Sequence, residues 1–579
     1  MKIYRNYLHL TLFLSLALSL KTQGQVSYID YESPFHPTIG KSGMVVSQNF
    51  QSSNIGIDIL NMGGNAIDAA VAVGFSLAIT LPRAGNLGGG GFMLVYIKEK
   101  DEIFSIDYRS KSPLTTSLKA IFNANLPKDY NSINRDIVRY GYKANAVPGT
   151  VAGLLAAHNE FGKLSLNQIL EPVIKQAMDG IKVSYDLHQA IKSTPQLFDD
   201  QESKKIYYYK NKPFPIGKTM KRKDLANTIK LISENGVAGF YDGEIANKFE
   251  LAMKRNNGFI SIDDLKKYTV NFQVPISTIY RGNKIFTQGP PSGGGITLLT
   301  ALNILERINL KKYKSDSSIT YHLLAEALRR GHNNRSHHVG DPSFYNVPVN
   351  ELLSKKRTKE LLKDLNIKKA TPSSKVKPFH VINESKDTTH FSIIDKDGNA
   401  VSNTYTLGYS FGSGVTIPGT GILMNNQMNN FAFQYGDTTI KDRSASIGNR
   451  FMPGKRPMST MNPVMVFDKN NALSLITGSP GGSFIPAAVL RVISGVIDFK
   501  LDIGEATMLP RIHKDWPYQG LEYETMMNSS IAKRLMKIGH KMEKSKTMGS
   551  TQSIHIVNDV NYGYSDLRRP NAGVAIQID

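Results

Sequence analysis

The chain has 579 residues, with 70 Lys and Arg against 48 Asp and Glu, so its formal net charge is +22. Hydrophobic residues make up 41% and charged residues 20%, a globular composition that excludes collagen-like, coiled-coil and wholly disordered chains. The chain has no cysteine, which excludes a disulfide framework, a thiolate nucleophile and cysteine-ligated zinc or iron–sulfur sites.

The N-terminus has the order of charges, apolar core and small residues that is typical of a secretory signal. Lys2 and Arg5 precede an apolar run over residues 10–20, which is shorter than the roughly 20 residues of a membrane-spanning helix. We therefore expect residues 1–24 to be a signal peptide and the protein to be periplasmic or secreted, without stable membrane insertion. The alternative is an N-terminal membrane anchor.

The first predicted elements are two helices followed by a hairpin. Ser52 and Ser53 are expected to cap a helix that ends at Leu60, and Asn65 is expected to cap a second helix over 66–79. Strands at 92–97 and 103–108 follow as a hairpin. Residues 150–330 are mostly helical in pattern. The helices are expected at 149–160, 169–180, 224–235 and 319–330.

The next segment, 346–387, is rich in Lys, Ser and Pro and is expected to be a mobile connection. Within it, the basic stretch 355–369 alternates lysines with leucine pairs, as the solvated face of an amphipathic helix does. This stretch has no interleaved aromatic residues, and we expect no nucleic-acid partner.

From residue 388 the pattern becomes β-rich. The runs 388–394 and 400–406 are separated by a turn and should pair as a hairpin. If Ile394 faces Ala400, Thr388 lies opposite Thr406, and the two hydroxyl groups are within hydrogen-bonding reach. Cross-strand threonine pairs are common structural features, so this spacing alone does not indicate chemistry.

A second hairpin, 464–477, leads into the glycine-rich segment 478–482 and a helix over 484–496. Glycines before a helix allow backbone amides to stabilise an oxyanion or to bind a phosphate, while a tight turn without a ligand is the alternative. His332, His337 and His338 lie near Asp341, but their spacing is not a standard zinc pattern. We expect neither a metal nor an organic cofactor.

Ordered motifs along nearly the whole mature chain resemble the γ-glutamyltranspeptidase family, beginning with residues 43–96. Further matches lie at 106–109, 147–150, 240–243, 290–295, 425–428, 456–459, 478–482 and 566–570. The resemblance implies an α/β fold, the four-layer αββα sandwich of N-terminal-nucleophile hydrolases. It also implies a precursor that cuts itself between Asp387 and Thr388 into a large subunit, 25–387, and a small subunit, 388–579, which together form one fold.

The resemblance assigns the chemistry to Thr388, whose hydroxyl would attack the preceding carbonyl during self-cleavage. The α-amino group so released, with an ordinary pKa of about 7.7–8.0, would then act as general base for the same hydroxyl. Thr406 matches the threonine that hydrogen-bonds the nucleophile. The amides of Gly481 and Gly482 match the oxyanion hole. Arg109 matches the arginine that holds the substrate α-carboxylate through its planar fork.

The remaining matched positions include departures from the family. Ser459 and Thr460 match a serine pair that contacts the same carboxylate. The substrate α-ammonium is held in the family by side chains that match Gly408, Gln427 and Asn430, the last of which is an aspartate there. Because a hydrogen bond to a charged group contributes about 1.5–3 kcal/mol, losing the aspartate should weaken ammonium binding.

Three functions remain open. The leading one is an exported, self-processing γ-glutamyl hydrolase and transferase that acts on glutathione or γ-glutamyl peptides, with water, an amino acid or a peptide as acceptor. The second is an amidase for glutaryl-like substrates, which keep the carboxylate and lack the amine. The third is a non-catalytic periplasmic binding protein. Residues 431–453 are long enough to form a lid over the pocket.

Overall fold

The computed structural model separates residues 1–36 from residues 37–579, and only the second unit is considered below. The structure describes residues 36–122, 134–336, 338–372, 375–376, 387–433, 446–516 and 518–578. The predicted signal peptide lies outside the described residues. Within the described ranges, no helix combines the length and apolar character needed to cross a membrane.

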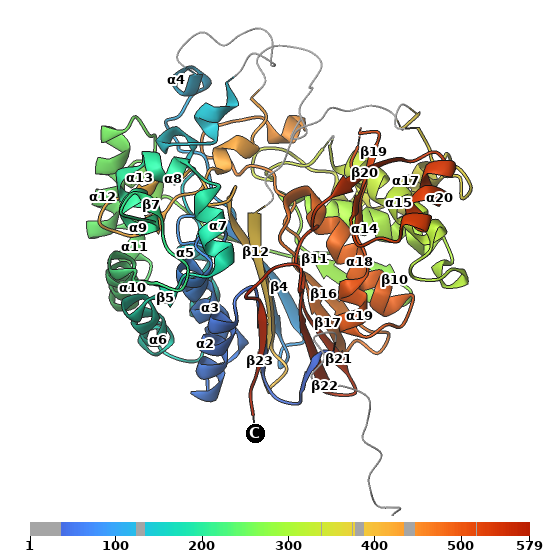
Figure 1. Cartoon of the computed structure of the whole chain (residues 1–579), viewed down its shortest axis with the longest axis horizontal. Helices are drawn as coiled ribbons and strands as arrows, with labels where there is room; N and C mark the ends of the chain where they lie inside the picture. The colour runs from blue at the N-terminus through green and yellow to red at the C-terminus, as the bar shows by residue number, and fades with distance from the viewer. Residues whose placement is uncertain are drawn as a thin grey trace, which may run out of the picture. The chain divides into compact units, whose positions relative to one another are not determined.

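Two antiparallel seven-stranded sheets lie side by side at the centre of this unit (Figure 1). The first sheet has the order β23 (Gly573–Ile576), β2 (Met44–Ser47), β12 (Asp387–Ile394), β13 (Ala400–Gly408), β3 (Gly90–Ile97), β4 (Glu102–Tyr108) and β9 (Asn271–Gln273). The second has the order β1 (Thr38–Gly40), β22 (Val560–Ser565), β21 (Gln552–Val557), β17 (Leu473–Thr477), β16 (Val464–Phe467), β11 (Asn283–Thr287) and β10 (Ile276–Tyr280).

Helices cover the outer face of each sheet (Figure 1). Beside the first sheet are α2 (Phe50–Asn61), α3 (Ala66–Thr80), α5 (Thr150–Phe161), α6 (Leu166–Asp179) and α10 (Lys223–Asn235). Beside the second are α14 (Gly293–Glu306), α15 (Ser318–Ser336), α18 (Ile485–Ile497), α19 (Ile503–Met508) and α20 (Ser529–Lys537).

Further helices and strands surround these layers. The helices among them are α4 (Leu118–Phe122), α7 (Tyr185–Lys192), α8 (Gln196–Asp199), α9 (Gln201–Tyr207), α11 (Ala238–Tyr241), α12 (Gly243–Arg255), α13 (Ile262–Lys266), α16 (Val349–Leu352) and α17 (Lys355–Leu362). The strands are β5 (Ile181–Lys182), β6 (Tyr208–Tyr209), β7 (Lys212–Pro213), β8 (Thr219–Met220), β14 (Thr416–Ile417), β15 (Ile422–Leu423), β18 (Ile512–His513), β19 (Gly520–Glu524) and β20 (Lys541–Ser545).

The alternation of side chains along the strands explains the four layers, because successive residues of a strand face opposite sides of the sheet. Leu94 and Met465 lie in the apolar core between the two sheets. Their neighbours face the helices instead, Met93 in the core beneath α3 and Val464 in the core beneath α14. Buried apolar residues on both faces of each sheet therefore produce the predicted αββα sandwich.

The second predicted helix begins as expected, whereas the first does not. Asn65 caps α3 by accepting from the backbone of Asp68, whose side chain accepts from the Asn65 backbone in return. The cap of α2, however, is Asn49 rather than Ser52 or Ser53. The hydroxyl of Ser52 lies buried inside the helix and bonds the Ser76 hydroxyl of α3 at 2.8 Å, so it joins two helices instead of starting one.

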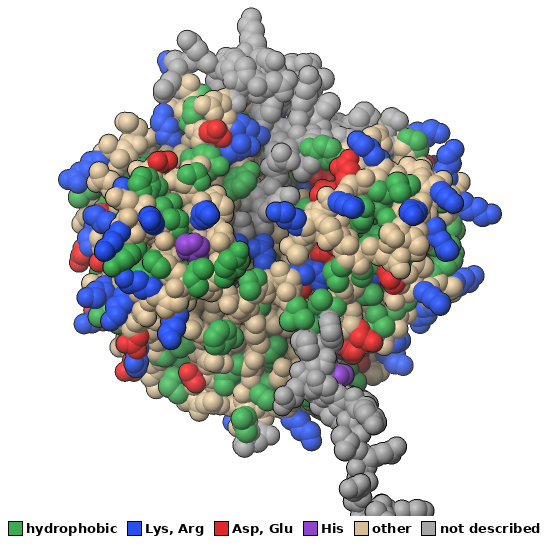
Figure 2. All heavy atoms as spheres, in the orientation of Figure 1, with side chains coloured by type: hydrophobic (Ala, Val, Ile, Leu, Met, Phe, Trp, Pro, Cys, Tyr) green, Lys and Arg blue, Asp and Glu red, His purple; other side chains and the backbone are tan. Residues whose placement is uncertain are grey.

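The segment 346–387 is only partly the connection that the sequence predicted, because it contains α16 and α17. Helix α17 is amphipathic as expected, with Leu361 buried and Lys355 exposed. Figure 2 shows Lys and Arg side chains spread across this face of the molecule among hydrophobic and neutral side chains.

The hairpin of β12 and β13 has the predicted register over most of its length, from Ile394 opposite Ala400 to Thr389 opposite Tyr405. The register then shifts, and Asp387 pairs with Gly408. The expected direct opposition of Thr388 and Thr406 is therefore wrong. Here β13 has one extra residue relative to β12, which is a β-bulge. A bulge changes the direction of nearby side chains, and the assumption of uniform pairing did not allow for it.

Candidate active site

A small pocket lies at the start of β12, and we call it the Thr388 pocket. It is lined by Arg109, Thr388, Thr406, Gly408, Asn430, Ser459, Thr460, Met461 and Gly482. Eight of these nine residues are among the ten that the sequence analysis assigned to catalysis or substrate binding, although they come from segments far apart in the chain. Sequence reasoning missed Met461, while Gly481 and Gln427 do not line the pocket.

Thr388 and Thr406 are both buried at the pocket wall, with 6% and 5% of their surface exposed. The Thr406 hydroxyl accepts a hydrogen bond from the Gly408 amide at 2.8 Å. Gln427 lies fully buried behind it and donates from Nε2 to the Thr406 carbonyl at 2.7 Å. In this structure Gln427 thus supports the strand that carries Thr406, and its assignment to the substrate ammonium stays a prediction.

The glycine loop, which we define as residues 478–482, has a backbone that other residues rarely adopt. Gly481 has φ +128° and Gly482 has φ +56°, both in the left-handed region. Gly482 then begins a short 3₁₀ helix that continues into α18. Its amide is therefore one of the helix-start N–H groups that have no carbonyl partner within the helix. This geometry suits amides that stabilise negative charge.

Arg109 follows β4 and is 2% exposed. Its Nη2 donates to Asn430 Oδ1 at 3.0 Å, and its Nε donates to the Pro457 carbonyl at 3.3 Å. The side chain is therefore held in one orientation with its guanidinium at the pocket. Asn430, expected at the ammonium end, instead contacts the arginine that was predicted to bind carboxylate.

A buried charge network behind Arg109 was not anticipated from the sequence. Asp107 accepts from the Arg109 amide at 2.9 Å and lies 3.4 Å from the Arg456 guanidinium. Burial raises the pKa of Asp107 to about 6, and the positive charge of Arg456 opposes that rise. Asp341 accepts from the Arg456 amide at 2.8 Å. The only sequence signal was a pair of charged residues, Asp107 and Arg109, at the end of a predicted strand.

Gly408 leaves no space for a side chain in this structure. Its φ is +106°, and an added Cβ would lie 2.1 Å from Asn426 Oδ1. That oxygen accepts from the Tyr409 amide at 3.0 Å. Restoring a side chain at position 408 therefore requires both a strained backbone and displacement of Asn426.

Ser459 and Thr460, the predicted serine-pair positions, are buried at 7% and 5% exposure. The Ser459 amide donates to the Pro291 carbonyl at 3.1 Å, and its hydroxyl accepts from the Met461 amide at 3.1 Å. The backbone around them is thus fixed against residues 290–295, another segment that the sequence had singled out.

His390 connects the nucleophile strand with the glycine loop. Its Nδ1 lies 2.8 Å from the Thr404 hydroxyl, and its Nε2 lies 3.1 Å from the Ser392 hydroxyl. A Cβ added to Gly478 would lie 2.3 Å from the ring, so glycine is needed there for close packing. Burial lowers the pKa of His390 to about 3 and keeps the ring neutral.

We expect acid to destabilise the fold through this histidine. Between its ordinary pKa of 6.5 and about 3, the unfolded chain binds a proton at this position that the folded chain does not, so stability falls as the pH is lowered through this range. One such group contributes a slope of about 1.4 kcal/mol per pH unit. His390→Gln should reduce the slope by about this amount in urea unfolding between pH 4.5 and 6. Parallel curves for the two proteins would contradict this expectation.

The sequence had singled out three histidines near Asp341, but the structure does not bring the described ones together as a metal site. His332 Nδ1 lies 3.5 Å from Asp515, Asp341 faces Arg456, and His337 lies outside the described residues. The described residues hold one group with metal-like spacing, His322, Glu326 and His540. In that group His322 already bonds His540 at 2.8 Å, and Glu326 pairs with Arg329 and Arg330.

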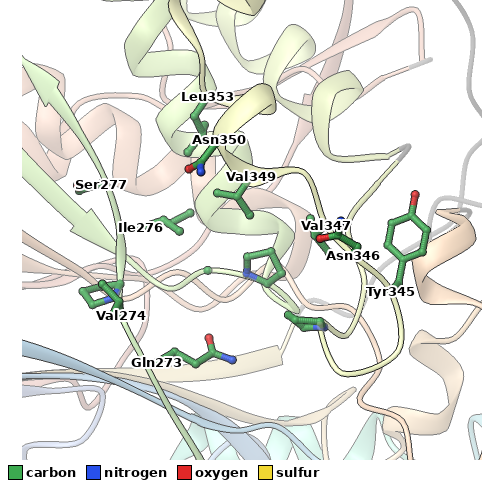
Figure 3. Close-up of a pocket in the computed structure, with 14 residues that line it drawn as sticks. Gln273, Val274, Ile276, Ser277, Tyr345, Asn346, Val347, Val349, Asn350 and Leu353 are labelled. Carbon is green, nitrogen blue, oxygen red and sulfur yellow. The ribbon is translucent and has the colours of Figure 1, made fainter.

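A much larger hollow, of about 770 Å³, lies at the edge strands β9 and β10 (Figure 3). Its wall includes Gln273, Val274 and Ile276 on one side and Tyr345 and Val347 on the other. None of the predicted site residues lines it. Its size alone therefore does not make it the reaction site.

Comparisons with known proteins agree with this fold. The profile of the Gamma-glutamyltranspeptidase family matches residues 52–576. The glutathione hydrolase proenzyme of Escherichia coli K12 is 40% identical over 547 residues, which cover 94% of this chain and 93% of that protein. The acylase ACY 1 proenzyme of Pseudomonas sp. SE83 is 33% identical over 520 residues and covers 89% of this chain and 90% of its own length.

A solved cephalosporin acylase from Bacillus halodurans has a TM-score of 0.82 at 26% identity, covering 96% of this chain and 100% of that one. The four layers and this structural likeness define the fold of an N-terminal-nucleophile hydrolase. Because the family profile matches nearly the whole chain, the identification is more specific. The chain belongs to the gamma-glutamyltranspeptidase family.

Proposed function

We propose that this chain is an exported precursor that cuts itself between Asp387 and Thr388 and then hydrolyses or transfers the γ-glutamyl group of glutathione and related peptides. The convergence of Thr388, Arg109 and Gly482 on one pocket carries this proposal, because it combines a nucleophile, a carboxylate ligand and a backbone amide. Relatives named glutathione hydrolase proenzyme support both the substrate and the precursor.

The reaction begins when the free amine of Thr388 takes the proton of its own hydroxyl, which attacks the γ-carbonyl of the substrate. The amides of Gly481 and Gly482 stabilise the oxyanion of the tetrahedral intermediate, where loss of one donor costs about 2.7–4 kcal/mol. Collapse of the intermediate expels the substrate amine, which takes up the proton, and leaves an ester on Thr388. Water, an amino acid or a peptide then attacks that ester and releases the glutamyl group.

Substrate orientation depends on Arg109, the one charged side chain among the described residues that line the pocket. The guanidinium of Arg109 binds the α-carboxylate in bidentate fashion, and Ser459 and Thr460 contact the same group. Among the described residues that line the pocket, none is an Asp or Glu that could pair with an α-ammonium. Ammonium binding therefore depends on neutral acceptors of the pocket.

This last feature favours a second candidate, an amidase for glutaryl-like acyl groups, which carry the carboxylate without the amine. The Asn430 side-chain oxygen already accepts a hydrogen bond from Arg109 Nη2, which leaves its amide hydrogens rather than an anion for the other end of the acyl chain. The similarity to acylases agrees with this candidate.

In either case, we propose that residues 1–24 are removed during export to the periplasm or the medium. The mature protein then consists of the subunits 25–387 and 388–579. None of the described helices is long and apolar enough to cross a membrane.

The two substrates are distinguished by turnover of a γ-glutamyl anilide and a glutaryl anilide by the purified, processed protein, beside an Asn430→Asp variant. We expect the wild type to prefer the γ-glutamyl anilide and the variant to raise its kcat/KM by about 10- to 100-fold, as one new charged hydrogen bond provides. Turnover of the glutaryl anilide should fall instead, because this substrate has no ammonium for the added carboxylate to bind and the carboxylate competes with the substrate for Arg109. A wild-type preference for the glutaryl anilide would instead establish the amidase.

A further inference from the structure

Three segments meet beside the Thr388 pocket at one end of the second sheet. Strand β17 ends in the glycine loop, β21 begins after residues 548–551, and β22 ends just before Asp566. Because β17, β21 and β22 are antiparallel neighbours, these ends lie side by side (Figure 1). We call residues 548–551 the strap.

The strap packs directly against the glycine loop. The Ser550 amide donates to the Ser479 hydroxyl at 3.0 Å, and the Gln552 amide, just beyond the strap, donates to the Gly478 carbonyl at 3.2 Å. A Cβ added to Gly481 would lie 3.1 Å from the Gly549 Cα. The positions of the loop amides are thus set by the backbone of the strap.

The strap itself is held by charged side chains. The Met548 amide donates to Glu524 at 2.8 Å, and the Met548 carbonyl accepts from Arg511 at 2.7 Å. At the other end, the Thr551 amide donates to Asp566 at 3.0 Å. Three backbone groups of a four-residue segment therefore bond to three buried ionic side chains.

These side chains form one closed network with balanced charge. Arg511 bonds Asp566 at 2.6 Å, and both side chains are 0% exposed. Arg568 forms a bidentate pair with Glu524, with two contacts of 2.7 Å, and also contacts Asp566 at 3.2 Å. Removing one member of such a buried network leaves its partners uncompensated, so the geometry depends on all four.

We propose that Glu524 and Asp566, together with Arg511 and Arg568, are positioning residues for the amides of Gly481 and Gly482, acting through the strap. This inference rests on the proposed function, in which those amides stabilise the oxyanion. It gives a role to the motif at 566–570, which contributes no residue to the Thr388 pocket. Because the oxyanion forms only in the reaction, the network affects kcat more than KM.

The test compares Asp566→Asn with Asp498→Asn in the full-length protein. Asp498 is also a fully buried aspartate, which pairs with Arg281 at 2.9 Å and accepts from Tyr280 at 2.6 Å. It lies at the opposite end of α18 from the glycine loop. Both variants remove one buried negative charge beside an arginine, so both should lower the thermal midpoint.

We expect Asp566→Asn to lower kcat on the preferred anilide by about 10- to 100-fold, with KM within about twofold of the wild type. Asp498→Asn should leave both constants within about twofold. Equal losses of kcat in the two variants, or an unchanged kcat in Asp566→Asn, would overturn the proposal. A wild-type protein that turns over neither anilide would contradict the proposed function instead, which separates the two failures.

A second variant is decisive if Asp566→Asn does not mature. Gly549→Ala leaves the charge network intact but places a methyl group 2.5 Å from the Ser479 hydroxyl, at a position with φ +74°. It should displace the loop and reduce kcat selectively in the same way. Wild-type kcat in folded Gly549→Ala protein would show that the strap does not position the loop.

Discussion

Replacing Thr388 by alanine leaves the precursor as one chain without amidase activity. The substitution removes the hydroxyl that attacks the Asp387 carbonyl and would later carry the acyl group, so both cleavage and turnover are lost. Activity should fall on the order of 10⁴-fold or more, as in other enzymes that lose the nucleophile. Intact mass spectrometry should show two chains for the wild type, the smaller beginning at Thr388, and a single chain for the variant.

Thr389→Ala is the matched control for this experiment. Thr389 is the next residue of the same strand and is fully buried, and its hydroxyl has no hydrogen-bond partner among the described residues. This variant should still be cut before Thr388 and keep most of its activity. A wild-type chain that stays whole would mean that the catalytic amine is never made, which would favour the non-catalytic binding protein.

Arg109→Lys should reduce kcat/KM on carboxylate-bearing anilides by about 10- to 100-fold, mainly through KM. The guanidinium is held by Asn430 Oδ1 and by the carbonyls of Pro457 and Met458, a set of contacts that one ammonium cannot reproduce while binding a carboxylate through two parallel bonds. Steady-state kinetics with the two anilides would measure the loss. An unchanged KM would remove Arg109 from substrate binding.

The control for Arg109→Lys is Arg139→Lys. Arg139 forms an ion pair of 3.4 Å with Asp136, whose side chain is mostly exposed, and such pairs contribute little free energy. Both substitutions keep the positive charge and change only the shape of the donor. Kinetic constants within about twofold of the wild type are expected for Arg139→Lys.

Local patterns in the sequence predicted much of the fold. The helix cap at Asn65 and the pairing of β12 with β13 follow from interactions within a few residues; the cap forms as expected, and the hairpin has the expected register from Ile394 to Thr389. The cap of α2 was misplaced because Ser52 bonds Ser76 on another helix, a contact that only the packed structure creates. The bulge in β13, opposite Thr388, is likewise a deviation that alternation rules do not include.

The site residues were predicted mainly from the resemblance of the sequence to a family. The structure adds their proximity and the contacts that hold them in place. Thr388, Arg109 and Gly482 belong to segments whose proximity no local rule predicts. The pairing of Asp107 with Arg456 was not anticipated, because buried ionic partners have no spacing signature in one sequence. The contact of Asn430 with Arg109 is also a tertiary event, and it changes the expected role of that asparagine.

The order of strands has a consequence for the protein after the proposed cut before Thr388. In the first sheet, β2 of the large subunit lies between β23 and β12 of the small one, and β13 pairs with β3. In the second sheet, β22 pairs with β1 and β16 pairs with β11. The two products are interlaced through five backbone ladders, so neither has a complete sheet of its own. We therefore expect the proposed cleavage to yield a heterodimer that dilution does not separate, and subunit exchange between molecules to require unfolding.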